Sequence, residues 1–404
     1  MNIAFIHYSA PPVVGGVETV LKRQAQQCKQ AGHQVWIIAG RGQNQETGIP
    51  VQLLPFIDSN HPRVLRIKSS MDRGHIPDDF SKLITQIEEE LSRAFAGMDV
   101  VIVHNVASLH KNLAFTAALY RISQKPKPPR FILWHHDLAW TTPRYQSEMH
   151  NGWPWDLLRK SWNGVTQVTI SEFRREELSK LMGIPEKMIH VVPAGLDMIE
   201  FLGLENRTIA LCEQLNLFAA GPILLAPVRI TRRKNLELAI ATMAELIKKM
   251  PDARLVVTGP PGAHNPTNVR YFKDLQKLRQ SKGVDKAVHL LAEFNPDGLP
   301  GSVVADFFKI ADALLMPSSE EGFGIPLLEA GLSRIPIFCS DIPQLKALAG
   351  DYASYFSPHD APEFVAGMIV DRLSHTPSFQ WRMKVRREYT WEAIYQQKIV
   401  PLLE

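Results

Sequence analysis

The sequence predicts an α/β chain built from two doubly wound domains in succession. With 404 residues, the chain is too long for one ordinary domain. Short, fully apolar runs alternate with amphipathic helical patterns, which is typical of parallel sheets covered on both faces. The alternation lapses between about residues 197 and 221 and then restarts, so the join between the domains is expected near residue 200.

In the first half, six apolar runs are typical of strands. A Pro- and Gly-rich loop, YSAPPVVGG, follows the first run, and apolar residues then recur at helical spacing until Gly32. Phe80, Leu83, Ile84, Ile87 and Leu91 mark a further helix. The six runs are NIAFIH, VWIIA, DVVIVHN, RFILWHHD, QVTIS and IHVVPAG.

The second half repeats the pattern with five apolar runs: PILLAPVR, ARLVVTG, AVHLLAEF, ALLMP and PIFCS. We therefore predict a first domain of residues 1–198, a second domain of residues 199–379, and a C-terminal helix at about 380–404 that packs back on the first. Because ligands bind beyond the carboxyl ends of parallel strands, the chemistry is expected in the loops after the strands. Two such domains are expected to line one cleft.

The composition limits the partners and the compartment. The formal net charge is +4, from 45 basic and 41 acidic residues, which gives no reason to expect nucleic acid. Cys28, Cys212 and Cys339 lie far apart in the sequence and are expected to be buried thiols. The N-terminus lacks the pattern of a secretion signal, and no apolar run is long enough to span a membrane. We expect a cytoplasmic protein, with peripheral contact to the inner face of the membrane left open.

The stretch SSEEGFGIPLLEAG (318–331) is the most informative loop. It follows a predicted strand, and Pro326 suits the first turn of the next helix. The main-chain N–H groups near Phe323, Gly324 and Ile325 would then lack helical partners and could bind an anion. Glu321 and Glu329 stand on either side and could accept hydrogen bonds from hydroxyls. This arrangement suggests a nucleotide diphosphate sugar, and a capped helix with a solvated glutamate is the alternative.

Three further strand-end loops carry polar groups. RITRRKN offers Arg229 and Lys234, two cations that could neutralise a diphosphate, although Arg232 and Arg233 suit a solvated basic turn better. Gly15 and Gly16 precede a helix and would let a phosphate approach the backbone, a weak signal by itself. In HHD (135–137), a metal site would need ligands that the sequence does not place, and we favour a polar group, His136, that faces the cleft.

Several enzyme classes are excluded by missing motifs. No G-x-G-x-x-G follows a strand, and G-x-x-x-x-G-K-[ST] and G-x-S-x-G are absent. The chain also lacks an Asp-x-Asp pair, so the simplest metal-bridged diphosphate site is missing. We expect no metal or other cofactor, which leaves side-chain cations and helix N-termini to balance the charge of a leaving diphosphate.

Taken together, these loops resemble those of a retaining glycosyltransferase of family 4, which has the two-domain GT-B fold. The most specific match is EGFGIPLLE (321–329), which is similar to the family's Glu-x7-Glu motif. The resemblance runs over nearly the whole chain. Its supporting motifs are GGVE (15–18), HHDL (135–138), TISEF (169–173), VVPAGLD (191–197), RITRRK (229–234) and LVVTG (255–259).

The resemblance implies a role for each matching residue. Arg229 and Lys234 would hold the donor diphosphate, Glu329 would bind the ribose hydroxyls, and Glu321 would meet hydroxyls of the transferred sugar. His136 would lie near the reacting sugar, although the neighbouring His135 leaves the match open by one residue. The main chain would contribute the remaining contacts: Gly322, Phe323, Gly324 and Ile325 to sugar and phosphate, Gly15 and Gly16 to the diphosphate, and the vicinity of Leu291 to the base.

The implied reaction moves a hexose from a UDP-sugar, with glucose preferred on family frequency, to a glycan or lipid-linked acceptor in polysaccharide or glycoconjugate synthesis. In the family's proposed mechanism, the leaving phosphate takes the acceptor's proton on the same face of the sugar. A sugar-nucleotide epimerase and a nucleotide-sugar binding subunit without turnover are the alternatives. The retained Arg229, Lys234, Glu321 and Glu329 favour the transferase.

The acceptor side carries weaker signals. Residues 56–79 are expected to form a long irregular stretch, either a solvated loop or a contact to a lipid headgroup or anionic glycan. Five of the eight tryptophans lie between Trp134 and Trp162, where they could pack or stack on a glycan. The chain departs from the family pattern at three positions, since Ala194 replaces an asparagine, Val228 a small residue and Arg334 a common glycine.

Overall fold

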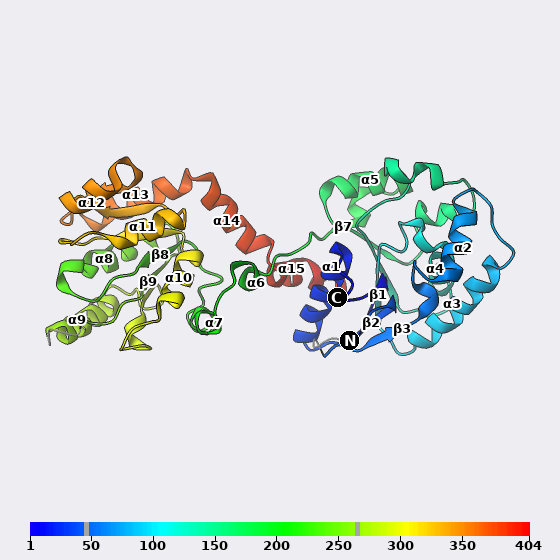
Figure 1. The fold of residues 1–404 in the computed structure, drawn as a ribbon, viewed down its shortest axis with the longest axis horizontal. Helices are drawn as coiled ribbons and strands as arrows, with labels where there is room; N and C mark the ends of the chain where they lie inside the picture. Colours follow the sequence, from blue (N-terminus) through cyan, green and yellow to red (C-terminus); the bar gives the residue numbers. More distant parts are fainter. Residues whose placement is uncertain (44–47, 263–266) are drawn as a thin grey trace. The chain divides into compact units, whose positions relative to one another are not determined.

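The chain divides into two compact units in a computed structural model that describes residues 1–43, 48–262 and 267–404 (Figure 1). Unit 1 contains Met1–Leu196 and Tyr389–Glu404, and unit 2 contains Asp197–Glu388. The return to unit 1 thus begins at Tyr389 rather than at about residue 380. The reason is that α14 (Pro377–Glu388) packs on unit 2. Its buried Arg386 donates a hydrogen bond to Asp312 of that unit at 2.9 Å.

Unit 1 is built on a parallel seven-stranded sheet of order β3-β2-β1-β4-β5-β6-β7. Six of these strands are the six predicted apolar runs, and the short β3 was not predicted. Their bounds are β1 (Asn2–Ser9), β2 (Gln34–Arg41), β3 (Val51–Leu53), β4 (Val100–His104), β5 (Arg130–His135), β6 (Thr166–Thr169) and β7 (Ile189–Val191).

Alternate residues of β1 pack into two different apolar clusters, as expected for a sheet covered on both faces. Ala4 and Ile6 join the cluster that includes the buried residues of α2, α3 and α4, whereas Ile3 and Phe5 join the cluster of α1 and the C-terminal segment. The helices are α1 (Gly16–Gln30), α2 (Pro62–Met71), α3 (Phe80–Ala94), α4 (Leu113–Ser123) and α5 (Glu172–Met182).

The expectation that residues 56–79 are irregular is wrong, because α2 lies within them. Pro62 begins this helix, and the His61 side chain accepts a hydrogen bond from the Arg63 N–H. Val64, Ile67 and Met71 form its buried face. Their spacing of three and four residues was a helical signal that the surrounding Pro, Gly and charged residues concealed.

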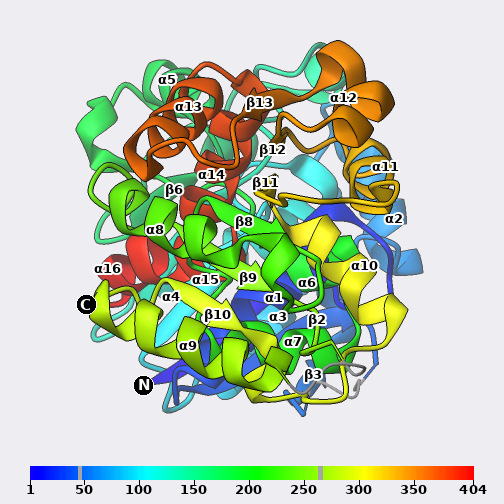
Figure 2. The same cartoon turned by 90° about the vertical axis from the view of Figure 1, so that its left-hand side faces the viewer.

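Unit 2 contains a second parallel sheet, with six strands in the order β10-β9-β8-β11-β12-β13 (Figure 2). The five predicted runs all form strands, and a short β13 is added. The strands are β8 (Ile223–Ala226), β9 (Arg254–Val257), β10 (Val288–Leu290), β11 (Ala313–Met316), β12 (Ile337–Ser340) and β13 (Ser354–Phe356). The helices are α6 (Met198–Leu202), α7 (Asn206–Gln214), α8 (Leu236–Leu246), α9 (Thr267–Ser281), α10 (Gly301–Ile310), α11 (Ile325–Leu332), α12 (Pro343–Ala349) and α13 (Pro362–Ser374).

The C-terminal segment packs on unit 1, which confirms the predicted crossing back. α15 (Trp391–Ile394), a π-helical turn at Tyr395–Ile399 and α16 (Val400–Leu403) follow one another. Their buried Ile394, Tyr395 and Ile399 join the same apolar cluster as Phe5. The predicted fold class, two doubly wound α/β units with this return, is therefore confirmed.

Two smaller observations complete the fold. All three cysteines are free and buried, as expected, and burial raises the pKa of each thiol to about 12. Across the described ranges, no helix is both long and apolar enough to cross a membrane. The cytoplasmic location and the peripheral membrane contact stay predictions.

Candidate active site

Two of the predicted loops meet at the carboxyl edge of the unit 2 sheet. β8 and β11 are neighbours in this sheet, so the segments that follow them, RITRRK and SSEEGFG, leave from the same edge. The Ser319 N–H donates to the Arg233 carbonyl at 2.8 Å and joins the two loops directly. Residues that are almost ninety positions apart in the sequence therefore form one group.

Lys234 and Glu321 form an ion pair at the centre of this group. Their Nζ and Oε1 atoms lie 2.5 Å apart, and the two side chains are only 9% and 7% exposed. The Ser318 hydroxyl also donates to Glu321 Oε1, at 2.7 Å. An ammonium has three hydrogens, so Lys234 keeps donors for a ligand although its charge is already balanced by Glu321.

Arg229 supplies an unbalanced positive charge at the same edge. Its side chain is exposed and forms no hydrogen bond or ion pair with any residue that the structure describes. Its backbone is fixed, because the Ile230 N–H donates to the Pro260 carbonyl at 2.9 Å. A Cβ at Gly259 would lie 2.2 Å from the Val228 carbonyl oxygen, so only glycine allows the loop after β9 to approach so closely.

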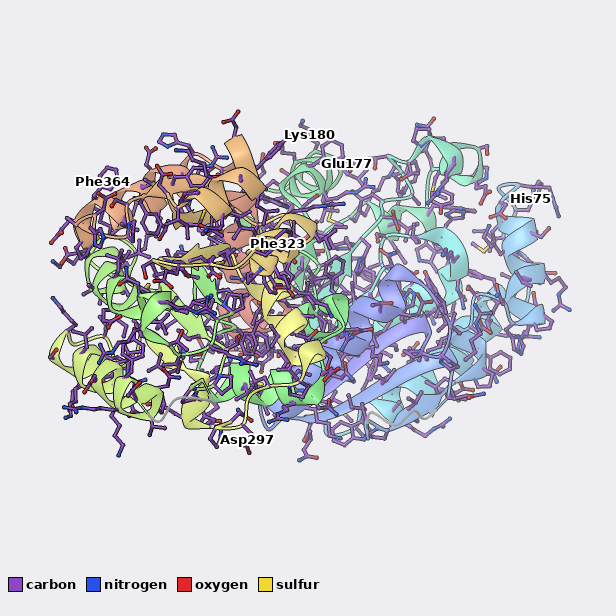
Figure 3. The ribbon with its side chains drawn as sticks, turned by 60° about the vertical axis from the view of Figure 1, so that its left-hand side comes forward. His75, Glu177, Lys180, Asp297, Phe323 and Phe364 are labelled. Atoms are coloured by element: carbon purple, nitrogen blue, oxygen red, sulfur yellow. The ribbon has the colours of Figure 1, made fainter. Side chains whose placement is uncertain are left out.

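The segment from Gly322 to Gly324 leads directly into α11, which begins at Ile325, as predicted. Gly324 has a left-handed backbone, with φ of 102°, and a Cβ there would lie 2.7 Å from the Leu345 side chain. Pro326 lies in the first turn of the helix. Phe323 projects from the loop and is 56% exposed (Figure 3). The local geometry suits the predicted anion contact, and the contact itself stays a prediction.

Glu329 differs from Glu321 in its surroundings. It lies one turn into α11, is half-buried, and has no ion pair or hydrogen bond among the described side chains. Burial raises its carboxyl pKa above the usual range. Both oxygens of Glu329 are therefore free to accept hydrogen bonds from hydroxyls.

Leu291 is placed less favourably than predicted. Its side chain is fully buried in the unit 2 core, where it begins a short 3-10 turn after β10. Its carbonyl accepts from the N–H groups of Phe294 and Asn295 at 3.1 and 2.9 Å. A nucleotide base could therefore contact only the main chain here. The prediction of a base near Leu291 is limited to such main-chain contacts.

In unit 1, Gly15 and Gly16 begin α1. A Cβ at Gly15 would lie 2.1 Å from the Glu18 carboxylate, whereas a Cβ at Gly16 would meet nothing within 4 Å. Glu18 Oε1 also accepts from the Ser9 hydroxyl at 2.6 Å. A carboxylate therefore already lies beside this helix start, and a phosphate that approached Gly16 would meet a like charge.

The two adjacent histidines after β5 have different environments. His135 is fully buried and its Nε2 lies 2.7 Å from Gln167 Oε1, within the sheet. His136 Nε2 instead lies 3.1 Å from Nδ1 of His104, and its Nδ1 has no partner among the residues described. Burial, with a smaller effect of His7, lowers the His136 pKa to about 4. His135 Nδ1 also lacks a partner among the described residues, but it is fully buried, so of the two histidines His136 is the one with a ring nitrogen available to a ligand.

Of the five clustered tryptophans, three are buried packing residues: Trp134, Trp155 and Trp162, at 1%, 3% and 3% exposure. Trp140 is half-buried, and the Arg159 guanidinium lies 4.0 Å from its ring centroid. Trp153, at 45% exposure, is the one that could still stack on a glycan.

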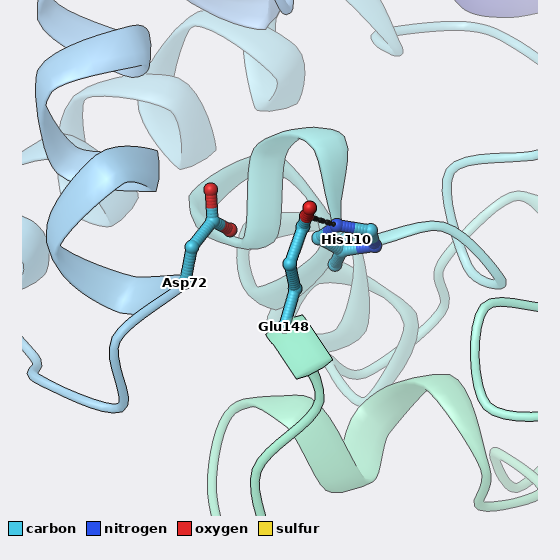
Figure 4. A group of neighbouring side chains, drawn as sticks. All are labelled: Asp72, His110 and Glu148. Carbon is cyan, nitrogen blue, oxygen red and sulfur yellow. Dashed lines mark hydrogen bonds and ion pairs between the residues drawn. The ribbon is translucent and has the colours of Figure 1, made fainter. Parts of the chain in front are cut away.

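Asp72, His110 and Glu148 bring metal-binding atom types within 4.8 Å of one another (Figure 4). His110 and Glu148 are hydrogen-bonded. The Lys68 ammonium already lies 2.6 Å from Asp72 and 3.0 Å from Glu148, where it supplies the positive charge that a metal ion would bring. This cluster is an ion-pair network that ties α2 to the segment around Glu148.

Sequence reasoning missed His7, Ser9, Glu18, His104 and Ser318. His7 lies near the end of β1, His104 ends β4, and Ser318 follows β11 by two residues. Polar residues at the carboxyl ends of parallel strands were the signal that identified the other loops. The same signal could have identified His7, His104 and Ser318.

With this geometry in place, comparisons with known proteins define the class. A model described as Glycosyltransferase Family 4 matches residues 14–199, and one described as Glycosyl transferases group 1 matches residues 211–377. Together they span most of both units, and the chain belongs to the glycosyltransferases that these models describe.

Two curated relatives match over most of their length. A mannosylglucosylglycerate synthase from Petrotoga mobilis is 26% identical over 370 residues, which cover 86% of this chain and 84% of the relative. An MMP alpha-(1->4)-mannosyltransferase from Mycolicibacterium hassiacum is 23% identical, covering 99% of this chain and 97% of that protein. Among solved structures, HepE from Anabaena in complex with UDP is 15% identical, with a TM-score of 0.37 and full coverage of both chains.

Proposed function

We propose that this glycosyltransferase moves a hexose from a nucleotide diphosphate sugar to a glycan or lipid-linked acceptor, with retention of the anomeric configuration. The observation that carries the proposal is the edge of the unit 2 sheet, where Arg229 and the Lys234–Glu321 pair stand beside the start of α11. Cations, free main-chain donors and an unpaired carboxylate are the groups that a diphosphate between two polyols requires.

In the proposed reaction, the bond between the sugar C1 and the diphosphate oxygen breaks while the acceptor oxygen bonds to C1 on the same face. The leaving phosphate takes the proton of the acceptor hydroxyl. Negative charge therefore grows on the diphosphate, where the Arg229 guanidinium and the free hydrogens of Lys234 would stabilise it. Because two side-chain cations fill this role, we propose that the reaction needs no metal ion.

The donor sugar is the least constrained part of the proposal. The resemblance to the family favours UDP-glucose on frequency alone. The names of the two curated relatives described above, a mannosylglucosylglycerate synthase and a mannosyltransferase, both include a mannosyl group. Glucose and mannose differ only in the direction of one hydroxyl, so one pocket could accept either. We therefore propose these two hexoses as the donor sugars to be compared.

A donor panel tests the proposal. The full chain is mixed with EDTA and with UDP, GDP, ADP or their glucose and mannose forms, and thermal unfolding is followed. A ligand that binds only the folded state stabilises it by about 2.7 kcal/mol at a hundredfold excess over Kd. We expect stabilisation by one nucleotide series, and loss of it in Glu329→Ala because the ribose hydroxyls lose their acceptor.

Turnover is then measured with the donor that this panel identifies, by NMR of the anomeric proton. The proton observed is that of the glycoside product or, when no acceptor is added, that of the released sugar. A product of the same anomeric configuration as the donor is expected. Inversion would contradict the retaining mechanism, and the absence of binding by any nucleotide would contradict the proposed function as a whole. Glu320→Ala, an exposed glutamate in the same loop, is the matched control.

A further inference from the structure

Three histidines from three neighbouring strands lie at the carboxyl edge of the unit 1 sheet. His7 is near the end of β1, His104 ends β4, and His136 directly follows β5. The strands lie in the order β1-β4-β5, so His7 and His136 are two strand spacings apart, or roughly 10 Å along the edge. All three rings are buried, at 5%, 0% and 8% exposure.

A carbonyl fixes the tautomer of His7. His7 Nδ1 lies 2.8 Å from the main-chain carbonyl of His104, and a carbonyl can only accept a hydrogen bond. Nδ1 therefore carries a hydrogen. Burial lowers the His7 pKa to about 4, despite the opposing effect of Glu18, so the ring is neutral near pH 7 and Nε2 keeps its lone pair. The Nε2 atom lies 3.9 Å from Glu18 Oε1, which is itself an acceptor.

The pair of His104 and His136 shares one hydrogen between Nδ1 of His104 and Nε2 of His136, 3.1 Å apart. If His136 donated, a neutral His104 would carry its hydrogen on Nε2. That atom is buried and has no partner among the described residues. If His104 donates from Nδ1 instead, its Nε2 carries no hydrogen. The atom left without a partner is then an acceptor and not a donor.

The second arrangement is favoured. A buried N–H without an acceptor is rarer in folded proteins than an unpartnered acceptor, and its desolvation is uncompensated. The aromatic neighbours of His104 offer no better solution, since its ring stacks on Phe5 and Trp134 at centroid distances of 6.2 and 5.5 Å. A charged His104 would place a cation in a fully buried site.

We propose that His104 donates from Nδ1 to His136 and so holds His136 with its hydrogen on Nδ1, which makes His136 a hydrogen-bond donor and His7 an acceptor for the hydroxyls of a bound hexose. The identity of the ligand rests on the proposed function. Sugar hydroxyls both donate and accept, so this edge offers them one fixed partner of each kind. His104 is a positioning residue because it acts through His136.

The tautomers can be read directly from the full chain with ¹⁵N-labelled histidine. Long-range ¹H–¹⁵N correlation spectra at pH 7.5 distinguish hydrogen on Nδ1 from hydrogen on Nε2, and His7→Gln and His136→Gln assign the signals. We expect hydrogen on Nδ1 of both residues. A His136 signal with its hydrogen on Nε2 would overturn the proposal without any reference to activity.

Ligand additions then test recognition and identify the source of the hexose. A shift of the His7 and His136 signals with UDP-glucose or GDP-mannose, but not with UDP or GDP, would assign the donor sugar. A shift with methyl α-glucoside or methyl α-mannoside alone would assign the acceptor. If no hexose moves either signal, the recognition is contradicted. If glycosides shift both signals but no nucleotide binds the protein, the proposed function fails while the hexose pair stands.

Variants of His104 separate positioning from folding. His104→Phe keeps a flat ring between Phe5 and Trp134 but removes the donor, so His136 should lose its single tautomer and turnover should fall on the order of 10-fold. Nucleotide binding should not change. His104→Asn restores a donor near the position of Nδ1 and should recover the tautomer. Replacing the buried His289 of unit 2 by Phe should leave the His136 spectrum unchanged. If a variant does not fold, the wild-type spectra still decide.

Discussion

The carboxyl edges of the two sheets hold their polar side chains in opposite ways. In unit 2 the edge is charged: Lys234 and Glu321 are paired at 2.5 Å, and Arg229 is exposed, with no ion pair to any residue in the described part of the chain. In unit 1 the rings of His7 and His136 are neutral near pH 7, since burial lowers the pKa of each to about 4, and the one carboxylate beside them, Glu18, lies 3.9 Å from His7. The same architecture therefore supports one edge suited to anions and one suited to hydroxyls.

The difference follows from how each edge compensates the cost of burying a charged side chain. A buried charge needs a partner, and Lys234 and Glu321 supply each other's. The histidines of unit 1 instead lose their charge and keep their hydrogen-bonding atoms. Fixed charge is useful where a leaving group gains negative charge, and neutral donors and acceptors are useful where hydroxyls are selected.

Lys234→Ala should have the largest effect, on both activity and stability. Loss of a donor to the growing charge should lower turnover by about 10²- to 10³-fold. Glu321 would also be left nearly buried without its partner, which typically costs about 3 to 5 kcal/mol. Steady-state kinetics and urea unfolding measure the two effects. Lys248→Ala, which removes a largely exposed ion pair, is the control and should change neither. Unchanged turnover in Lys234→Ala would remove Lys234 from the site.

Arg229→Ala should lower turnover by a similar factor of about 10² to 10³ but leave stability within about 0.5 kcal/mol. The reason is that Arg229 is exposed and has no ion pair among the described residues. Thermal unfolding and kinetics on the same preparation separate the two quantities. The exposed Arg233 in the same loop serves as the control. A large loss of stability in Arg229→Ala would show that the guanidinium has a structural role instead.

Mild acid should destabilise unit 1 more than unit 2. Burial lowers the folded-state pKa of His7, His135 and His136 to about 4, below the usual 6.5, while His289 is the corresponding group among the residues of unit 2 that the structure describes. Such a group stabilises the fold above its unfolded pKa, and this stability is lost as the pH falls from 6.5 toward 4. Each group can contribute up to about 1.4 kcal/mol per pH unit.

Hydrogen exchange followed by mass spectrometry at pH 7 and pH 5 can measure this for each unit separately, with rates corrected for pH. Peptides of β1, β4 and β5 should lose protection before those of β8 and β11. Equal loss in both units, or earlier loss in unit 2, would contradict the account of the neutral histidine edge.

Arg334→Gly should have the smallest effect, a gain of about 1 kcal/mol in stability. Arg334 follows α11 with φ of 58°, a left-handed backbone that costs a non-glycine residue roughly 1 to 2 kcal/mol. The greater freedom of glycine in the unfolded chain offsets part of the gain. Denaturant unfolding measures it, and Arg334→Ala, which keeps the Cβ, should not show it. Equal stability of the two variants would rule out backbone strain at this position.

The two sheets, the helix start at Ile325 and the meeting of the loops around Lys234 and Glu321 were predictable because each depends on local pattern or on the geometry of parallel strands. The ion pair between Lys234 and Glu321 was not, since the sequence places two ligand-binding residues without showing that they neutralise each other. The buried side chain of Leu291 was missed for a related reason: a strand-end residue can face the core as readily as the ligand edge.

Helix α2 and the histidine edge show two further limits. The helical spacing of Val64, Ile67 and Met71 was present, but Pro, Gly and charged neighbours suggested a loop. His7 and His104 were counted as strand residues, and only the strand order β1-β4-β5 shows that they lie beside His136.

The most direct test of the central claim is calorimetric titration of the full chain with the nucleoside diphosphate selected by the donor panel, in EDTA. The account predicts binding without metal that weakens at least 10-fold in Arg229→Ala and falls with added salt, since side-chain cations hold the diphosphate. Binding that requires Mg²⁺ and is indifferent to Arg229 would contradict it.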